Sequence, residues 1–580
     1  MTEHSQEVEA ARSHPPREVL SGDGLPPQAV AWPRQPVQEP AIASPHRDAV
    51  WMGRPSQRSL VEIRTVSGPG AGRVWPLGMG VHDIGSAPGS TIEISGNGIP
   101  ERGVQVKIDP SGRAWLVLPA DAAGASPIRV SMISPPEDEH IRQRKAGETP
   151  WPTGSDLVLG DVLLRVTSPS VADAAVVTSD GPGYDYIRVP RTVPPLPGGR
   201  YRLPQPPTIR HRSQISTGLT VATVLLVSIG VAWLLSSFFL LVFVLVSFAV
   251  AGLYWISTQR PARRAFLGDL KAHWEVRAAT NAGIRQMIAE ERKLRCDTLM
   301  DPACAALTAI GPGHRLWERR RGDADHLVLR VGTVDQPSAI EIEEPAREGA
   351  QRLFRWNLHD VPFGVDVAAR GVLGLVGEDS ARRAIAGWMV IQAAVLHSPR
   401  ELQLCLLTDG SAQTSWDWRW VRRLPHIWRG QAVLAGGDPK SVSQCVEELA
   451  SVVRARGLRS AGAASPMVFG GPDILVVLDG SRRLRNVEPI ARILAEGPAL
   501  RVFSICLDEH ELFLPRECTS VVRCDPAAVA VSQQDLPDFA GIRPDLVTAA
   551  WCDRIASSLT QLHDLPMPQD AAPVGSWGGA

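Results

Sequence analysis

The apolar and polar positions of the 580-residue chain change pattern several times from one end to the other. Residues 59–168 contain short apolar and β-branched runs, such as SLVEIRTV and GVQVKID, separated by Gly, Pro, Asn and Asp. This pattern predicts an all-β sandwich. Residues 1–58 and 569–580 lack periodicity, and we expect them to be disordered tails.

The longest apolar run covers residues 217–257 and carries no charged side chain. One membrane crossing by a helix needs about 20 apolar residues, so the run is long enough for two. Two serines at its centre divide it into expected helices at 217–235 and 238–256, a transmembrane hairpin within residues 213–258. Arginines flank both ends, which predicts a cell-membrane protein with both termini in the cytoplasm. The alternative, one long buried helix, would need a polar face.

The segments on either side of this run have different compositions. Residues 169–212 are so rich in proline that helix and sheet interior are disfavoured, and we expect an extended linker. Residues 259–315 are charged, with apolar residues three and four positions apart, which predicts a helical stalk.

Residues 316–568 alternate apolar strands with amphipathic helical segments. Strands of this kind predict a parallel sheet covered on both faces by helices. The expected strands are GVLGLVG, LQLCLLTD (402–409), DILVVLDG (473–480), LRVFSICLD (500–508) and SVVRC (520–524). The whole chain is therefore expected to be multi-domain, with this α/β domain at its C-terminal end.

The first of these strands runs into a turn that has the position of a nucleotide-binding P-loop. A working loop reads G-x-x-x-x-G-K-[ST]; its backbone N–H groups hold the phosphates, its Lys reaches them, and its hydroxyl binds Mg²⁺. From Gly377 the chain has the first glycine, but Arg382, Arg383 and Ala384 replace the Gly, the Lys and the Ser/Thr. Two acidic residues directly after Gly377 oppose a polyphosphate. We therefore expect residues 316–568 to be a degenerate P-loop-type domain without ATP turnover.

Asp479 ends the expected strand DILVVLDG and resembles a Walker B aspartate, although Gly480 follows it instead of a second carboxylate. The degenerate nucleotide pocket would thus comprise Gly377, Arg383 and Asp479. Ser380 is the expected N-cap of the next helix. Because cations are unfavourable in a first helical turn, Arg383 needs a carboxylate partner, for which Glu378, Asp379 and Asp479 are the candidates.

A second Lys-Ser pair, Lys440–Ser441, opens a helix after two glycines. Pro439 stands where a P-loop has its second glycine. We explain the pattern by Asp438 as the N-cap and Pro439 as the first helical residue.

Overall composition excludes several functions. The formal net charge is -1, so the chain has no global basic character that would indicate nucleic-acid binding. The eight cysteines have no zinc-type spacing, and we expect reduced thiols and no metal site.

The order of these parts resembles the FtsK/SpoIIIE-type membrane-anchored ATPases of type VII secretion systems. The matching segments are YDYIRVPRTVPPLPGGRYRLPQPP, HRLWERRRGDADHLVLRVGTV, GVLGLVGEDSARRAIAGWMVIQAAVLHSPRELQLCLLTD, WRWVRRLPHI, DILVVLDGSRRLR and GIRPDLVTAAWCDRIASSLTQLHD. The resemblance implies an FHA-like sandwich, a membrane hairpin, a stalk and a degenerate ATPase-like domain. It also implies an oligomer that works with other membrane subunits of the secretion system.

The chain departs from this family in two places. No G-x-x-x-x-G-K-[ST] occurs in it, so we expect ATP and Mg²⁺ to be cofactors of active relatives and not of this chain. ATP-hydrolysing domains would lie on a separate chain or in C-terminal domains missing here. FHA domains bind phosphothreonine through Gly-Arg and Ser-Arg-x-His motifs, but Ser86 and Gly103 stand at the Arg and His positions, and Arg102 is one position out of register. Phosphopeptide binding is expected to be lost.

Three functions remain open from the sequence. The favoured one is a membrane-anchored, non-catalytic component of a type VII-like secretion machine. The second is an ATP-binding FtsK-like translocase of DNA or protein, of which this chain is the N-terminal part. The third is a membrane signalling scaffold that uses the FHA-like domain.

Overall fold

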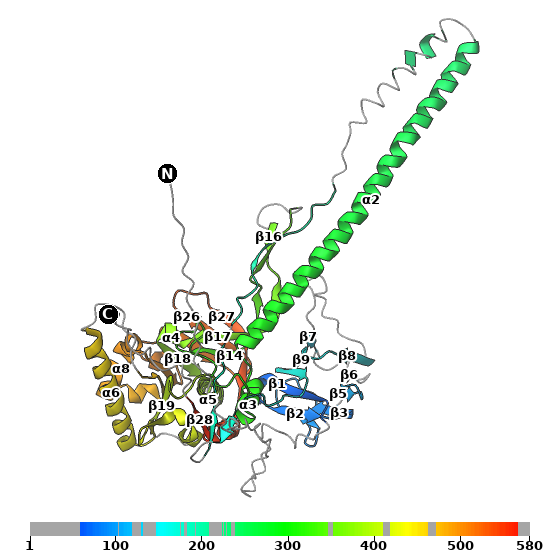
Figure 1. The fold of residues 1–580 in the computed structure, drawn as a ribbon. Helices are drawn as coiled ribbons and strands as arrows, with labels where there is room; N and C mark the ends of the chain where they lie inside the picture. The colour runs from blue at the N-terminus through cyan, green and yellow to red at the C-terminus, as the bar shows by residue number, and fades with distance from the viewer. Residues whose placement is uncertain are drawn as a thin grey trace, which may run out of the picture.

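The computed structural model describes residues 59–102, 104–118, 129–131, 147–174, 176–178, 183–191, 193–207, 238–345, 352–409, 418–461 and 471–565, with a few positions between 223 and 233. A β-sandwich and an α/β domain lie side by side, and one long helix projects away from both (Figure 1). The expected tails, 1–58 and 569–580, lie outside the described residues.

The predicted sandwich is present as two sheets that share one core, and all their strand pairs are antiparallel except β3 with β4. One sheet has the order β2-β1-β10-β9-β7 and the other β4-β3-β5-β6-β8. Apolar residues of both sheets, among them Ile63, Trp75 and Trp151, form the core between them. The strands are β1 (Val61–Pro69), β2 (Val74–Leu77), β3 (Gly80–Gly85), β4 (Ile92–Glu93), β5 (Val104–Ile108), β6 (Ala114–Leu118), β7 (Arg129–Ser131), β8 (Gly147–Trp151), β9 (Asp156–Leu159) and β10 (Val162–Thr167).

The predicted parallel sheet is also present, and the five expected strands are confirmed. They are β18 (Val372–Gly377), β19 (Leu402–Thr408), β23 (Asp473–Asp479), β24 (Val502–Asp508) and β25 (Ser520–Cys524), in the spatial order β19-β23-β24-β18-β25. The strand order changes direction at β18. In open α/β sheets, ligands usually bind where the strand order changes direction, at the carboxyl ends of the strands.

Further strands and the helices complete the α/β domain. Strands β22 (Ala435–Gly436), β26 (Val529–Gln533), β27 (Phe539–Leu546), β14 (Val328–Pro337) and β17 (Asn357–Asp366) extend the sheet, and β20 (Trp428–Arg429) pairs with β21 (Ala432–Val433). The helices are α3 (Pro302–Ile310), α4 (Val367–Arg370), α5 (Asp379–Leu396), α6 (Pro439–Ala461), α7 (Ser481–Leu484), α8 (Glu488–Glu496) and α9 (Ala549–Leu559). Helix α6 begins as the sequence predicts, because Asp438 accepts hydrogen bonds from the backbone N–H groups of Lys440 and Ser441.

Helix α5 lies inside the domain instead of on its surface. Every residue from Ala381 to Leu396 is buried, because α5 packs on the sheet and is covered by α3 and α9. Apolar residues of both the strand and the helix are buried: Val372, Leu373, Leu375 and Val376 in β18, and Ala384, Ile385, Trp388, Met389 and Ile391 in α5.

The sandwich and the α/β domain are joined through a shared sheet. The end of β1 pairs in parallel with β27 at Gly68 and Pro69. Beside this junction the guanidinium group of Arg330 donates to the carboxylate of Asp545 at 2.7 Å and to the carbonyl oxygen of Val66 at 3.1 Å, and both charged side chains are buried. The sandwich is thus a fixed part of the body and not a separate module on a tether.

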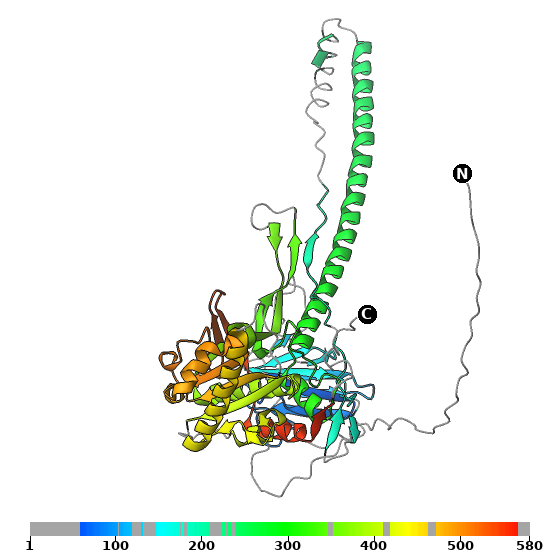
Figure 2. The same cartoon turned by 60° about the vertical axis from the view of Figure 1, so that its left-hand side comes forward.

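The predicted transmembrane hairpin is wrong. Helix α2 (Phe238–Thr298) is a single helix that includes the second expected crossing and most of the expected stalk (Figure 2). Within the described residues, no helix is long and apolar enough to cross a membrane. The predicted cell-membrane location with two crossings is contradicted by the same finding. Much of 213–237 lies outside the described residues.

The expected linker, 169–212, supplies strands to two small sheets. Strand β12 (Tyr184–Tyr186) lies between β11 (Val176–Thr178) and β28 (Leu562–Asp564), and β13 (Gly199–Arg202) pairs with β15 (Ile340–Glu343), which pairs with β16 (Leu353–Phe354). Tyr184–Tyr186 contains no proline, which is why it can take a central place in a sheet. Leu203 and residues of β15 pack against Ile284 and Ile288 of α2, and this contact fixes the direction in which α2 projects.

Candidate functional site

The turn where a P-loop would lie is too short to form one. Strand β18 ends at Gly377, helix α5 begins at Asp379, and only Glu378 lies between them. Gly377 has a φ of +117°, and a Cβ atom there would lie 2.2 Å from the carbonyl oxygen of Cys524. The glycine is therefore required by the close approach of β25 and not by a bound phosphate.

The backbone N–H groups of this turn are occupied by the chain itself. The N–H of Gly377 donates to the carbonyl oxygen of Glu509 at 3.2 Å, and the N–H of Glu378 donates to that of Cys524 at 3.1 Å. In a working P-loop, N–H groups at this place point at the phosphates. Here they join β18 to the ends of the two neighbouring strands.

The predicted N-cap at Ser380 is wrong. Helix α5 begins two residues earlier than this cap implies, Glu378 occupies the cap position, and no side chain accepts a capping hydrogen bond. The hydroxyl of Ser380 instead donates to the carboxylate of Glu378 at 2.6 Å.

Arg383 binds two carboxylates, as its position in the first turn of a helix requires. Its Nε and Nη2 atoms donate to the two carboxylate oxygens of Asp479, at 2.8 and 3.4 Å, and its Nη1 atom donates to Asp379. Two of the three predicted partners are thus confirmed, and Glu378 is not one of them. Arg383 and Asp479 are each 6% exposed, so the pair is almost completely shielded from water.

Trp418 completes this arrangement. Its indole N–H donates to Asp479 at 2.8 Å, which adds a neutral donor to the same carboxylate that Arg383 binds. We refer to Asp379, Arg383, Trp418 and Asp479 as the Arg383 cluster. Trp418 lies more than 30 residues from either aspartate in the sequence; it opens the segment WRWVRRLPHI, which indicated the family resemblance but no contact with Asp479.

Arg382 stabilises the turn from the other side. Its guanidinium group donates to the carbonyl oxygen of Gly377 at 2.7 Å and to Asp379 at 2.6 Å. Of the three residues expected to line a degenerate pocket, Arg383 and Asp479 are in direct contact, and Gly377 is linked to them through Arg382 and Asp379.

The residues at this turn do not fit Mg-ATP. Asp379 and Asp479 balance the two arginines, so little positive charge is left for a triphosphate. Ala384 has no oxygen for a metal ion. We therefore derive no reaction step through a nucleotide at this place.

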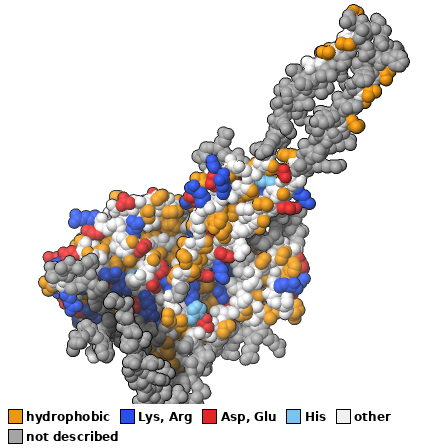
Figure 3. Space-filling view, turned by 45° about the horizontal axis from the view of Figure 1, so that its top comes forward, with side chains coloured by type: hydrophobic (Ala, Val, Ile, Leu, Met, Phe, Trp, Pro, Cys, Tyr) orange, Lys and Arg blue, Asp and Glu red, His pale blue; other side chains and the backbone are white. Residues whose placement is uncertain are grey.

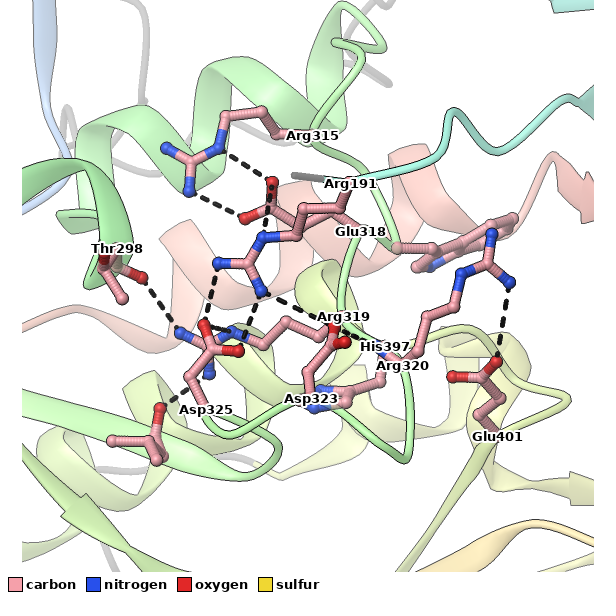
Figure 4. A network of polar contacts seen from close by, with 12 residues as sticks. Arg191, Thr298, Arg315, Glu318, Arg319, Arg320, Asp323, Asp325, His397 and Glu401 are labelled. Atoms are coloured by element: carbon pink, nitrogen blue, oxygen red, sulfur yellow. Dashed lines mark hydrogen bonds and ion pairs between the residues drawn. The ribbon is translucent and has the colours of Figure 1, made fainter. Parts of the chain in front are cut away.

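A second polar network lies under the LWERR segment, Leu316–Arg320 (Figure 4). Arg191 of the proline-rich segment forms two hydrogen bonds of 2.8 Å with the carboxylate of Asp325. Arg319 donates to the carbonyl oxygens of Val328 at 2.7 Å and Thr298 at 3.1 Å. Burial lowers the pKa of Arg319 to about 10, although the charge of Asp325 acts in the opposite direction. The motif therefore fastens the proline-rich segment to the α/β domain.

Three buried histidines lie next to this network. His397 and His326 are in edge-to-face contact, with ring centroids 5.0 Å apart, and His426 binds the carbonyl oxygen of His397 at 2.7 Å. Burial lowers the pKa of His426 to about 4, and burial together with the charge of Arg319 lowers the pKa of His397 well below its usual value. Both rings are neutral at physiological pH.

Charged side chains of both signs occur together on one face of the molecule. On the face shown in Figure 3, Lys and Arg side chains are interspersed with Asp and Glu. This distribution agrees with the near-zero net charge of the sequence.

Comparisons with known proteins relate the chain to one kind of secretion component. No protein-family model matches it. Over 228 residues it is 28% identical to the ESX-4 secretion system protein EccC4 of Mycobacterium tuberculosis, a match that covers 36% of this chain and 18% of that protein. Over 183 residues it is 30% identical to EccC3 of the ESX-3 system of the same organism, covering 29% and 14%.

The chain is a relative of the EccC proteins of type VII secretion systems. The predicted resemblance to FtsK/SpoIIIE-type secretion ATPases is thereby confirmed. A third relative, EccC of Thermomonospora curvata, is 25% identical over 218 residues, covering 34% of this chain and 16% of that protein. The matched part spans less than a fifth of the length of each of these relatives.

Solved structures give weaker likenesses. A structure of T. curvata EccC (ATPases 2 and 3) in complex with a signal sequence peptide has a TM-score of 0.29 at 17% identity, covering 43% of this chain and 50% of that chain. The FHA domain of CT664 from Chlamydia trachomatis has a TM-score of 0.16 at 14% identity, covering 19% and 98%. The sequence matches, and not these low scores, establish the relationship with EccC.

Proposed function

We propose that this chain is a non-catalytic component of a type VII-like protein secretion machine. Its relatives are EccC proteins, one of which is described as a type VII secretion ATPase. In this proposal ATP hydrolysis is supplied by another chain or by further ATPase domains, and the described domains bind other subunits of the machine. The division into an FHA-like domain at 59–168 and a degenerate P-loop-type domain at 316–568 is part of the proposal.

The Arg383 cluster is the observation that supports a non-catalytic role most strongly. Arg383 stands at the position of the P-loop lysine, yet its guanidinium group is bound by two carboxylates of the chain. A nucleotide would have to displace the buried Asp479 and the half-exposed Asp379. Removing one partner from a buried ion pair costs about 3–5 kcal/mol, and two acidic residues would remain next to the phosphates.

The architecture supports a structural role. The sandwich is joined to the α/β domain by a shared sheet and by the hydrogen bond from Arg330 to the carbonyl oxygen of Val66, and to α2 by the buried ion pair of Arg292 with Asp156. A body of this kind can hold partner subunits at fixed positions.

Phosphate release from Mg-ATP by the purified full chain tests the proposal. We expect no release above that of a buffer blank, both for the wild-type protein and for Arg383→Lys, which restores only the lysine of the motif. Turnover by the wild-type chain that is abolished in Asp479→Asn would refute the non-catalytic role and favour the translocase.

A further inference from the structure

Two of the eight free cysteines lie next to each other in the α/β domain. Cys506 lies in β24 and is completely buried, whereas Cys518 lies between Leu514 and β25 and is half-buried. The thiols of Cys506 and Cys518 share a hydrogen bond. Two reduced thiols, one of them reached by solvent, are thus placed side by side.

The strand register explains why these two residues meet. Cys506 is paired with Gly374 of β18, and paired residues of neighbouring parallel strands direct their side chains to the same face of the sheet. A Cβ atom at Gly374 would lie only 2.3 Å from the Cδ1 atom of Leu514. The segment that begins at Leu514 therefore packs directly on this face, which brings Cys518 to the side chain of Cys506.

Backbone hydrogen bonds hold Cys518 at this place. Its N–H donates to the carbonyl oxygen of Pro515 at 3.2 Å. The next residue, Thr519, donates through its N–H to the carbonyl oxygen of Val372 at 3.2 Å and through its hydroxyl to that of Arg370 at 2.7 Å. Cys518 therefore stays on the sheet while part of its surface remains accessible to small molecules.

The two thiols have different roles in any exchange reaction. The hydrogen bond with Cys518 raises the pKa of Cys506 well above its usual value, and burial acts in the same direction. Cys506 therefore keeps its proton and can donate it to the sulfur of Cys518. A thiolate at Cys518 is stabilised by this donor, and the thiolate is the form that attacks a disulfide.

We propose that Cys506 and Cys518 form a reversible redox site, which a small-molecule disulfide such as oxidised glutathione converts to an intramolecular disulfide. The Cys518 thiolate attacks one sulfur of the small disulfide, and the thiolate that leaves takes up the proton lost by Cys518. The Cys506 sulfur then attacks the Cys518 sulfur, and its proton goes to the second leaving thiolate. Two thiols of the chain are oxidised, and one small disulfide is reduced to two thiols.

The new bond would act on the segment that lies against the turn at Gly377. This segment includes Glu509, whose carbonyl oxygen accepts a hydrogen bond from the N–H of Gly377 at 3.2 Å. A disulfide between its two ends restricts the unfolded chain, so the oxidised α/β domain should be more stable than the reduced one. The redox site is independent of the proposed function.

Incubation of the purified full chain with oxidised glutathione, followed by denaturation, alkylation of free thiols, proteolysis and mass spectrometry, tests the site. We expect most of the native wild-type chain to carry a link between Cys506 and Cys518, which excess reduced glutathione removes. The melting temperature of the linked form should exceed that of the reduced form. Cys405 and Cys445 are the internal control: they also lie near each other, but both are buried, so both should be recovered as alkylated thiols.

Single variants separate the two steps. In Cys506→Ala, Cys518 should keep one bound glutathione, because no second thiol displaces it. In Cys518→Ser, Cys506 should remain a free thiol, and oxidised glutathione should leave the melting temperature unchanged. The matched control is Cys552→Ala, which removes a buried cysteine of α9 and should form the link as the wild type does. Far-UV circular dichroism checks that each variant is folded.

Three results would overturn the proposal. The first is a wild-type chain in which both thiols stay free under oxidised glutathione. The second is a glutathione adduct on Cys518 that persists in the wild type, since Cys506 would then be unable to displace it. The third is a link that forms only in urea-denatured protein, because the folded chain would then not bring the two sulfur atoms together.

Discussion

Breaking the Arg383 cluster should destabilise the α/β domain strongly. Arg383 and Asp479 are each 6% exposed, and Arg383→Met would leave the Asp479 carboxylate with the indole N–H of Trp418 as its donor. Removing one partner of a buried pair costs about 3–5 kcal/mol, because the remaining charge stays away from water without compensation. Asp479→Leu should cost less, about 2–3 kcal/mol, because Arg383 keeps its contact with the half-exposed Asp379.

The double variant distinguishes a buried pair from two unrelated defects. With both charges removed, Arg383→Met/Asp479→Leu should be no less stable than Arg383→Met alone, which corresponds to a coupling energy of about 2–3 kcal/mol. The matched control is Arg423→Met, which breaks the exposed pair with Asp553 and should cost less than about 1 kcal/mol.

Urea unfolding followed by far-UV circular dichroism and tryptophan fluorescence measures these effects. Because a chain with several domains does not unfold in one step, the midpoint of the α/β transition is the quantity to compare. The reasoning fails if Arg383→Met lies within about 1 kcal/mol of the wild type. It also fails if Mg-ATP restores the stability of that variant, since the cluster would then be a nucleotide site.

Three further outcomes follow from contacts outside the cluster. Burial lowers the pKa of His426 to about 4 in the folded chain, whereas its usual pKa of about 6.5 applies when the chain is unfolded. The free energy of unfolding should therefore fall as the pH drops from 6.5 towards 4, by about 2 kcal/mol at pH 5. The melting temperature of His426→Gln should depend less on pH than that of the wild type. Arg330→Met should cost about 3–5 kcal/mol and expose the junction of sandwich and α/β domain to limited proteolysis, because it leaves a buried carboxylate without its partner. Gly72→Ala should lower the melting temperature far more than Gly154→Ala: both have positive φ, but only at Gly72 would the new Cβ atom meet Trp551, at 2.4 Å.

Local sequence patterns predicted the features that depend on neighbouring residues. The five parallel strands were identified from short apolar runs, and the start of α6 from Asp438 followed by Pro439, because strand burial and helix capping are decided within a few residues. The need of Arg383 for a carboxylate also followed from its place in a first helical turn.

Features that depend on distant contacts were missed. Ser380 was expected to cap α5, but the helix begins two residues earlier, after a turn in which Gly377 lies against the end of β25. The segment WRWVRRLPHI marked Trp418 only as part of a family match, since its contact with Asp479 forms only on folding. The membrane hairpin was inferred from the absence of charge in one apolar run. In the structure the second half of that run belongs to a single helix that continues into the charged stalk. The pairing of Tyr184–Tyr186 with β28 joins segments more than 370 residues apart, beyond any local pattern.

Isothermal titration of the full chain with Mg-ATP tests the central claim most directly. We expect no saturable heat at nucleotide concentrations up to about 1 mM, because the Arg383 cluster fills the place of the phosphates with the chain's own ion pairs. Arg383→Ala is the informative variant, since it opens the cluster without adding a group that binds phosphate, and it should show no heat either. A dissociation constant in the low micromolar range for the wild type, lost in Arg383→Ala, would contradict the account and show that the turn is a divergent but working nucleotide site.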